Sequence, residues 1–114
     1  MNAMNAMAWI YLLLAAALEI AMGLALKLNQ GWTRVLPSAI AIAAALASIY
    51  LLALALRALP VGTAYAIWTG IGTVGLVAVG IFWFGESLTW SRVGFLTLAI
   101  VGIAGLRFSG GDAA

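Results

Sequence analysis

Four long apolar stretches, separated by three short polar segments, occupy almost the whole chain. They extend over residues 7–28, 36–56, 61–84 and 90–108. A helix that crosses a bilayer needs about 20 predominantly apolar residues, and each stretch meets that length. The pattern predicts an all-α integral membrane protein, with four transmembrane helices forming a single domain over residues 1–114.

The polar segments contain the residues expected at helix boundaries. "KLNQGWTRVLPS" ends with Pro37, and "RALPVGT" contains Pro60; proline suits the first turn of the helix that follows. The third segment, "GESLTWSR", includes Glu86 and Ser87 at a boundary, where a carboxylate favours the next helix N-terminus. None of the segments is long enough to form a lid or a second domain.

Composition narrows the function further. Hydrophobic residues make up 67% of the chain and charged residues 7%, against the roughly 25% charged that soluble domains average. Because there is no cysteine and no histidine, disulfides, thiol nucleophiles and most metal sites are excluded. We expect a multi-pass protein of the cell (inner) membrane, with no enzyme activity, no cofactor, no metal and no nucleic-acid partner.

The basic residues are divided almost evenly between the two sides of the membrane. With four spans, Arg57 and Arg107 lie on one side, and Lys27, Arg34 and Arg92 lie on the other. A membrane protein is oriented by a clear excess of Lys and Arg on its cytoplasmic side. Here the two sides hold two and three basic residues, which is a small difference. This balance supports the hypothesis that the chain inserts in both orientations.

The first apolar stretch contains one carboxylate, Glu19, near its middle. A carboxylate at the bilayer centre costs at least about 2.5–3.5 kcal/mol and usually belongs to a substrate pathway or proton relay. Helical spacing places Ala15, Ala16, Met22 and Gly23 beside it, where small side chains leave room for a ligand. The alternative is a neutral, hydrogen-bonded acid that holds helices together.

The third stretch carries an aromatic and polar stripe. Tyr65, Trp68, Thr69 and Gly72 recur at i, i+3, i+4 and i+7, so they share one helix face. Aromatic rings attract organic cations, and hydroxyl groups orient polar ligands. With Glu19, this stripe predicts a cation-binding site. The alternative for Tyr65 and Trp68 is an interfacial aromatic belt.

Glycines in the same stretch have two interpretations. Gly70 and Gly72 can act as a hinge, which would serve alternating access in a transporter. They can also simply allow a neighbouring helix to pack closely. The two roles are compatible.

Ser48 is the main buried polar candidate in the second stretch. A lone serine in a transmembrane helix most often bonds its own backbone, so a role at the binding site competes with that interpretation. In the fourth stretch, Gly94 and Gly102 indicate a face on which helices pack, and we interpret it as a dimer seam.

Taken together, four spans in 114 residues, the glutamate in the first, "LPVGTAYAIWTGIG" opening the third and "GES" after it resemble the small multidrug resistance family of proton-coupled exporters. The resemblance covers about residues 8–108. It implies an antiparallel homodimer, or a heterodimer with a paired homologue. Glu19 would bind both proton and cation, Tyr65 and Trp68 would form the aromatic wall, and Ser48 would be the second-helix polar group.

The motifs "WTGIGTVG" and "FGES" resemble the guanidinium-exporter branch more than the quaternary-ammonium drug exporters. The guanidinium branch usually has tryptophan three residues after the glutamate, where this chain has Met22. A flexible methionine makes a roomier site, open to substituted guanidinium compounds or quaternary cations. Outside this family, the alternatives are a non-transporting structural membrane subunit and a passive channel.

Overall fold

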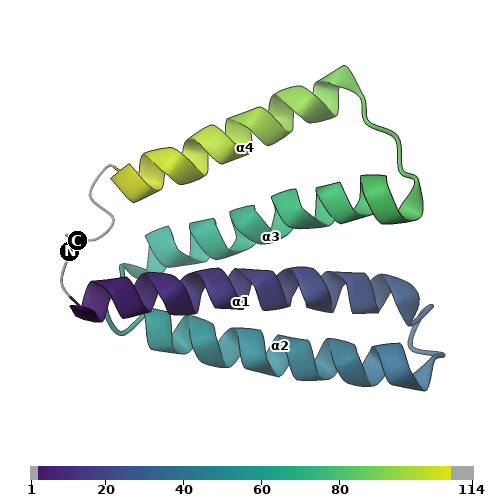
Figure 1. The fold of residues 1–114 in the computed structure, drawn as a ribbon, viewed down its shortest axis with the longest axis horizontal. Coiled ribbons are helices and arrows are strands. Elements are labelled where there is room, and N and C mark those ends of the chain that lie inside the picture. The colour runs from purple at the N-terminus through teal and green to yellow at the C-terminus, as the bar shows by residue number, and fades with distance from the viewer. Residues whose placement is uncertain (1–2, 109–114) are drawn as a thin grey trace.

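The computed structural model describes residues 3–108 and consists of four helices joined by short loops (Figure 1). They are α1 (Ala3–Leu28), α2 (Val35–Ala55), α3 (Val61–Phe84) and α4 (Trp90–Phe108). The prediction of an all-α chain with four helices is confirmed. The third and fourth helices have the predicted bounds, α1 begins four residues earlier, and α2 lies one residue earlier. The side chain of Arg107, used in the charge count, lies outside the described part.

Three of the helices are long and apolar enough to cross a membrane, namely those over residues 5–28, 35–55 and 61–84. The apolar part of α4, Trp90–Leu106, is shorter. Helices suit this environment because each satisfies its own backbone hydrogen bonds where water is absent. A short last span agrees with its lower hydrophobicity in the sequence, where serine, threonine and arginine interrupt the apolar residues.

The loops end the helices by recognisable local chemistry. Pro60 is the N-cap of α3, in extended backbone, and Gly85 is its C-cap in the left-handed conformation, with φ of 67°. A left-handed residue costs glycine little, because it has no Cβ. Between α1 and α2 the backbone turns through three left-handed residues, Gln30, Gly31 and Trp32. This turn closes on Asn29, whose side-chain oxygen accepts a hydrogen bond from the Trp32 backbone N–H at 3.2 Å.

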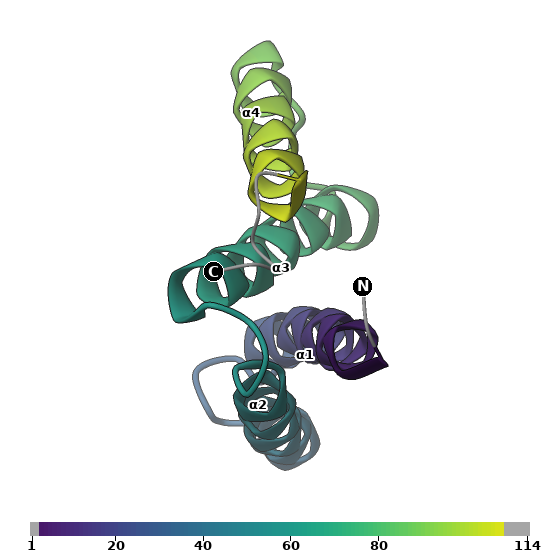
Figure 2. The same ribbon diagram turned by 90° about the vertical axis from the view of Figure 1, so that its left-hand side faces the viewer.

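The helices lie side by side in the order α4, α3, α1, α2, so α1 is flanked by α2 and α3 (Figure 1). The described chain is a flat body of 43 × 35 × 18 Å. Seen from its end, the α4 helix stands apart from α1 and α2 and contacts only α3 among the helices (Figure 2). The outer face of α4 is therefore without a neighbour in a single copy of the described chain.

The most extensive packing joins α1 to α2. Buried alanines line both sides of this contact, among them Ala15 and Ala16 on α1 and Ala41 and Ala44 on α2. Helices in lipid associate through such small residues, which let two backbones approach closely. A cluster of buried side chains continues from here into α3 through Leu12, Leu52 and Ile67, and Trp68 packs against it.

Candidate functional site

The carboxylate of Glu19 lies in the middle of α1, against α3. Its contact there is the backbone of Gly72: a Cβ atom at position 72 would lie 2.6 Å from Oε2 and 2.8 Å from Cδ. Oε2 is buried and has no hydrogen-bond partner among the described residues. A buried carboxylate oxygen without a hydrogen-bond donor costs free energy, and a bound proton or cation would lower that cost.

One helical turn away, Ser48 connects three helices. Its hydroxyl donates to the backbone oxygen of Ala15 in α1 at 2.7 Å and accepts from the indole Nε1 of Trp68 in α3 at 3.0 Å. Only 1% of Ser48 is exposed. In an α-helix the carbonyl of residue 15 also accepts the N–H of residue 19, so Ser48 is bonded to the turn that carries Glu19.

This arrangement decides what the serine hydroxyl can still do. A hydroxyl has one proton to donate, and Ser48 uses it on Ala15. The remaining capacity is that of an acceptor, which suits a ligand that carries N–H groups. Ser48 therefore bonds a neighbouring helix and not its own backbone, which was the commoner expectation for a lone serine.

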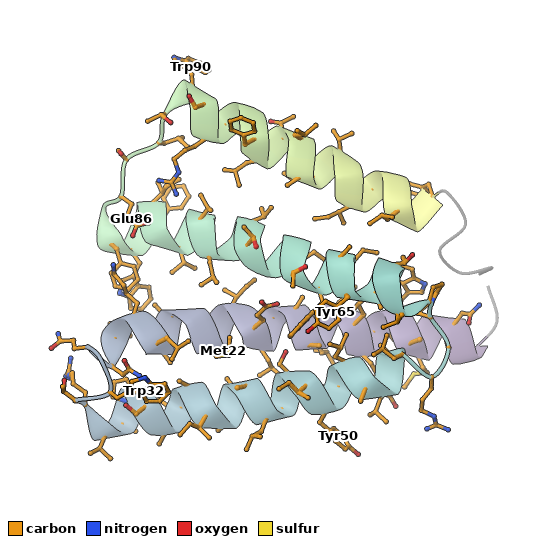
Figure 3. All side chains as sticks on the ribbon, turned by 180° about the vertical axis from the view of Figure 1, so that it is seen from behind. Met22, Trp32, Tyr50, Tyr65, Glu86 and Trp90 are labelled. Carbon is orange, nitrogen blue, oxygen red and sulfur yellow. The ribbon has the colours of Figure 1, made fainter. Side chains whose placement is uncertain are left out.

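Tyr65 extends the aromatic surface outward from this buried pair. Its ring contacts that of Trp68 edge to face, with 5.0 Å between centroids and 72° between planes. Tyr65 of α3 is labelled in Figure 3, and 51% of it is exposed, whereas Trp68 is hydrogen-bonded to the buried Ser48. Trp68 is one turn before Gly72, which contacts Glu19, and aromatic rings near a carboxylate are suited to an organic cation.

The α1 residues predicted to line the site do not all face the same neighbouring helix. Ala15 and Ala16 are completely buried at the contact of α1 with its neighbours. Met22 is seven residues after Ala15, on the side of α1 toward α2 (Figure 3). Gly23 faces α3, where a Cβ atom would lie 2.6 Å from Leu76 Cδ1, so this glycine serves helix packing.

Thr69 lies on the predicted stripe, but its hydroxyl bonds its own helix, donating to the backbone oxygen of Tyr65 at 2.8 Å. The two glycines next to it are also in close contact. A Cβ atom on Gly70 would lie 2.8 Å from Ile103 of α4, and Gly72 contacts Glu19. The α3 helix is continuous from Val61 to Phe84. Both glycines thus allow close packing, and the hinge stays a prediction.

The face of α4 assigned to a dimer is open. A Cβ atom on Gly94 or Gly102 would meet nothing within 4 Å, and the large side chains of Phe95, Leu98 and Val101 are exposed around them. In this single copy of the chain, that face has no covering element within the described residues.

Sequence reasoning missed an ion pair at the loop end of the same helices. Lys27 Nζ lies 3.9 Å from Glu86 Oε2 and 5.6 Å from the ring centroid of Phe84. The sequence treats Lys27 and Glu86 as separate residues at helix ends. The pair could have been predicted, because Lys27 and Glu86 have opposite charges and lie at the ends of two helices that finish on the same side of the membrane.

The described residues include no cluster of three or more histidine, cysteine, aspartate or glutamate side chains able to hold a metal ion. What the site offers instead is one carboxylate, an aromatic wall and a hydrogen-bonded serine among apolar helices. These are the elements of a small multi-pass membrane transporter.

Comparison with known proteins identifies the family. The model of the Small Multidrug Resistance protein family matches residues 7–104. A guanidinium exporter of Citrobacter freundii is 50% identical over 103 residues, covering 90% of this chain and 98% of the relative. Guanidinium exporters of Yersinia pseudotuberculosis and Escherichia coli O6:H1 are each 47% identical over 103 residues, covering 90% of this chain and 99% and 98% of themselves. The chain belongs to the small multidrug resistance family, whose members are multi-pass transporters of the inner membrane.

Proposed function

We propose that this chain exports small guanidinium-type organic cations in exchange for protons, and that both bind at Glu19. The observation that carries the proposal is the buried Oε2 of Glu19, which has no donor among the described residues and lies one turn from the Ser48–Trp68 hydrogen bond. The guanidinium-exporter names of relatives at about 50% identity support the same substrate class.

The chemistry of guanidinium fits these groups. It is a planar cation with N–H donors around its edge, so a carboxylate can accept two parallel hydrogen bonds from it. Its flat face can stack on Trp68 or Tyr65, whose rings already meet edge to face. Ser48 has only acceptor capacity left, and a ligand made of donors can use it.

Coupling then requires only mutual exclusion. A cation binds when Glu19 is ionised and leaves when protons take its place. The coupling free energy is the difference in cation affinity between the two protonation states. If the cation left without protons binding in its place, the proton gradient would not drive export. Export against a cation concentration gradient therefore depends on the Glu19 carboxylate.

The proposal includes an antiparallel homodimer in which two Glu19 carboxylates share one site. The near balance of basic residues across the membrane supports insertion in both orientations. The open face of α4, with Gly94 and Gly102, supports helix pairing there. A heterodimer with a paired homologue would use the same surfaces, and the second chain would then contribute its own residues beside Met22.

The test uses purified protein in liposomes with a pH gradient. We expect guanidinium-driven proton exchange with wild type, none with Glu19→Gln, and wild-type exchange with Thr97→Val. Thr97 is a matched control, since its hydroxyl bonds only its own helix, at Val93 O. Coupled transport that survives in Glu19→Gln rejects the role of this residue.

The substrate series separates the alternatives. Electrical recordings on supported membranes compare guanidinium, its alkyl derivatives and tetraalkylammonium ions. Currents with bulky ammonium ions alone would assign the chain to the drug-exporter branch, as the flexible Met22 allows. Current without proton exchange indicates a channel, and the absence of any transport indicates a structural subunit.

A further inference from the structure

The contact between α1 and α3 continues from Glu19 to the loop end of both helices. Along α1 the contacting residues recur every four positions, and α3 has a matching series, so each pair is about one turn from the next. The backbone and the partner side chain are close at each pair, because a Cβ atom on each glycine of the series would meet that side chain. The pairs between α1 and α3 are Glu19 with Gly72 and Gly23 with Leu76; at the loop end Gly80 of α3 contacts Glu86, which pairs with Lys27 of α1.

This contact ends in a group of three residues that we call the outer cluster: Lys27, Phe84 and Glu86. The ammonium group of Lys27 lies 3.9 Å from the Glu86 carboxylate and 5.6 Å from the Phe84 ring centroid. The Lys27 and Glu86 side chains are 59% and 42% exposed. The outer cluster therefore repeats the chemistry of the inner site, a carboxylate with an aromatic ring, at a place that water can reach.

Glu86 is held firmly in this position. Gly85 turns the chain with a left-handed φ of 67°, and the Glu86 backbone N–H then donates to the Gly80 carbonyl at 3.0 Å. The carboxylate itself packs on Gly80, where no side chain intervenes. A carboxylate fixed in this way loses little conformational entropy when it binds a cation.

A small cavity adjoins the cluster. It has a volume of about 150 Å³, and its walls include Gly23, Leu76 and Gly80 as well as the cluster residues. Pockets for drug-sized ligands start at about 300 Å³, so this space suits only a smaller ligand. Lys27 lies eight residues from Glu19, about 12 Å along the helix axis.

We propose that Phe84 and Glu86 form a second, outer binding site for small organic cations, and that the Lys27 ammonium group occupies this site when no free cation does. The inference rests on the proposed cation transport, and it adds a station through which the cation passes on its way to or from Glu19. A free cation competes with Lys27 for the Glu86 carboxylate and the Phe84 ring. Lys27 is thus an internal competitor, not a ligand-binding residue.

Guanidinium transport kinetics in liposomes test this directly. We expect Glu86→Gln and Phe84→Leu each to raise the KM for guanidinium about three- to five-fold, the effect of losing one exposed carboxylate or ring contact. Lys27→Gln removes the competitor and lowers KM by a similar factor. The maximal rate should change less than KM in all three variants. In Lys27→Gln/Glu86→Gln, KM should equal that of Glu86→Gln alone.

Two controls exclude a general charge effect. Arg34→Gln removes the same charge at the same end of the molecule, since Lys27 is in the last turn of α1 and Arg34 is the N-cap of α2, the next helix. Its KM should equal that of wild type. Repeating the series at about 1 M salt, where the screening length is about 3 Å, should leave the Phe84→Leu effect in place.

The outcomes are distinct. If Lys27→Gln and Glu86→Gln change KM in the same direction, the ion pair is a structural latch and the outer site is rejected. The proposal also fails if KM is unchanged in Phe84→Leu, or if Arg34→Gln matches Lys27→Gln. Absence of transport by wild type would overturn the proposed function itself, and normal wild-type transport with unchanged variants would overturn only the outer site.

Discussion

The Glu19 carboxylate lies directly against the backbone of Gly72, where a Cβ atom would be 2.6 Å from Oε2. Real side chains do not tolerate that distance, so the position of the carboxylate requires glycine at residue 72. The contact also fixes the height of α1 relative to α3. Gly72 is one turn after Trp68 in α3, so the contact places Glu19 about one turn from the Ser48–Trp68 hydrogen bond.

The first prediction concerns this contact. Gly72→Ala forces the carboxylate away from α3 or pushes the two helices apart, and either change misplaces the group that binds the cation. A displacement of about 1 Å can cost two orders of magnitude in rate, so we expect at least a tenfold loss of guanidinium-driven proton exchange. Overpacking should also lower the free energy of unfolding in detergent by about 1–3 kcal/mol.

Gly62→Ala is the matched control for that substitution. Gly62 is in the same helix, and a Cβ atom there would meet nothing within 4 Å. The alanine should keep transport at the wild-type level, because its Cβ meets no other atom there. Equal losses in the two variants would show that the glycine content of α3 matters and the Glu19 contact does not.

A second prediction concerns the hydrogen bonds through Ser48. Ser48→Ala leaves the indole N–H of Trp68 without its acceptor, and Trp68→Phe leaves the serine without that donor. Hydrogen bonds between membrane helices average about 0.6 kcal/mol and reach about 1.7 kcal/mol in double-mutant cycles. We expect a coupling energy within that range from reversible unfolding of the two single variants and the double variant.

Thr97→Val tests whether such an effect is specific to bonds between helices. Its hydroxyl donates to Val93 O within α4, on an exposed face. The change in unfolding free energy should be smaller than for Ser48→Ala. A zero coupling energy between Ser48 and Trp68 would mean that their contact does not hold α2 and α3 together.

Hydrophobic pattern alone predicted the four helices, because a chain in lipid must satisfy its backbone within each helix and the spans must match the bilayer. The helix ends were predicted less accurately than the helices themselves. The α1 helix begins at Ala3, since nothing in the alanine- and methionine-rich start of the chain opposes helix. Which helices touch could not be predicted, because all four spans are apolar and packing depends on small differences in shape.

The candidate site could be predicted only where a residue is costly to place in a membrane, such as Glu19. Glu19 and Trp68 stand out against an apolar background, and the structure brings their turns together. The partners were not predictable: Ser48 bonds Ala15 across 33 positions of sequence, and the Lys27–Glu86 pair joins residues 59 positions apart. Both depend on which helix faces which, information that a hydrophobic pattern does not contain.

A third prediction follows from competition between proton and cation. Cation binding requires the ionised form of Glu19, so guanidinium affinity should be constant at high pH and should fall as pH decreases. Each proton released on binding changes the apparent dissociation constant about tenfold per pH unit. Two coupled carboxylates in a dimer would give a slope between one and two.

Binding measurements in detergent over a pH series test this. In Glu19→Gln the affinity should be low, and the pH dependence that protonation of Glu19 causes should be lost. The other two acidic residues of the chain, Glu86 and Asp112, remain in that variant and act as an internal control. A pH dependence that persists in Glu19→Gln would assign the competing proton to one of them.

The last prediction concerns the exposed face of α4. If Gly94 and Gly102 pack against a second copy, a large side chain at either position will separate the two helices, because membrane association depends on close backbone approach. We expect Gly102→Leu to shift the protein from dimer to monomer, measured by light scattering in detergent and by cross-linking in membranes. Transport should fall in parallel, since a lone Glu19 cannot complete a shared site. Ala43→Leu is the control, an equally large change at an exposed position of α2. A Gly102→Leu protein that remains dimeric would show that α4 lies against lipid and that the two copies meet through another helix.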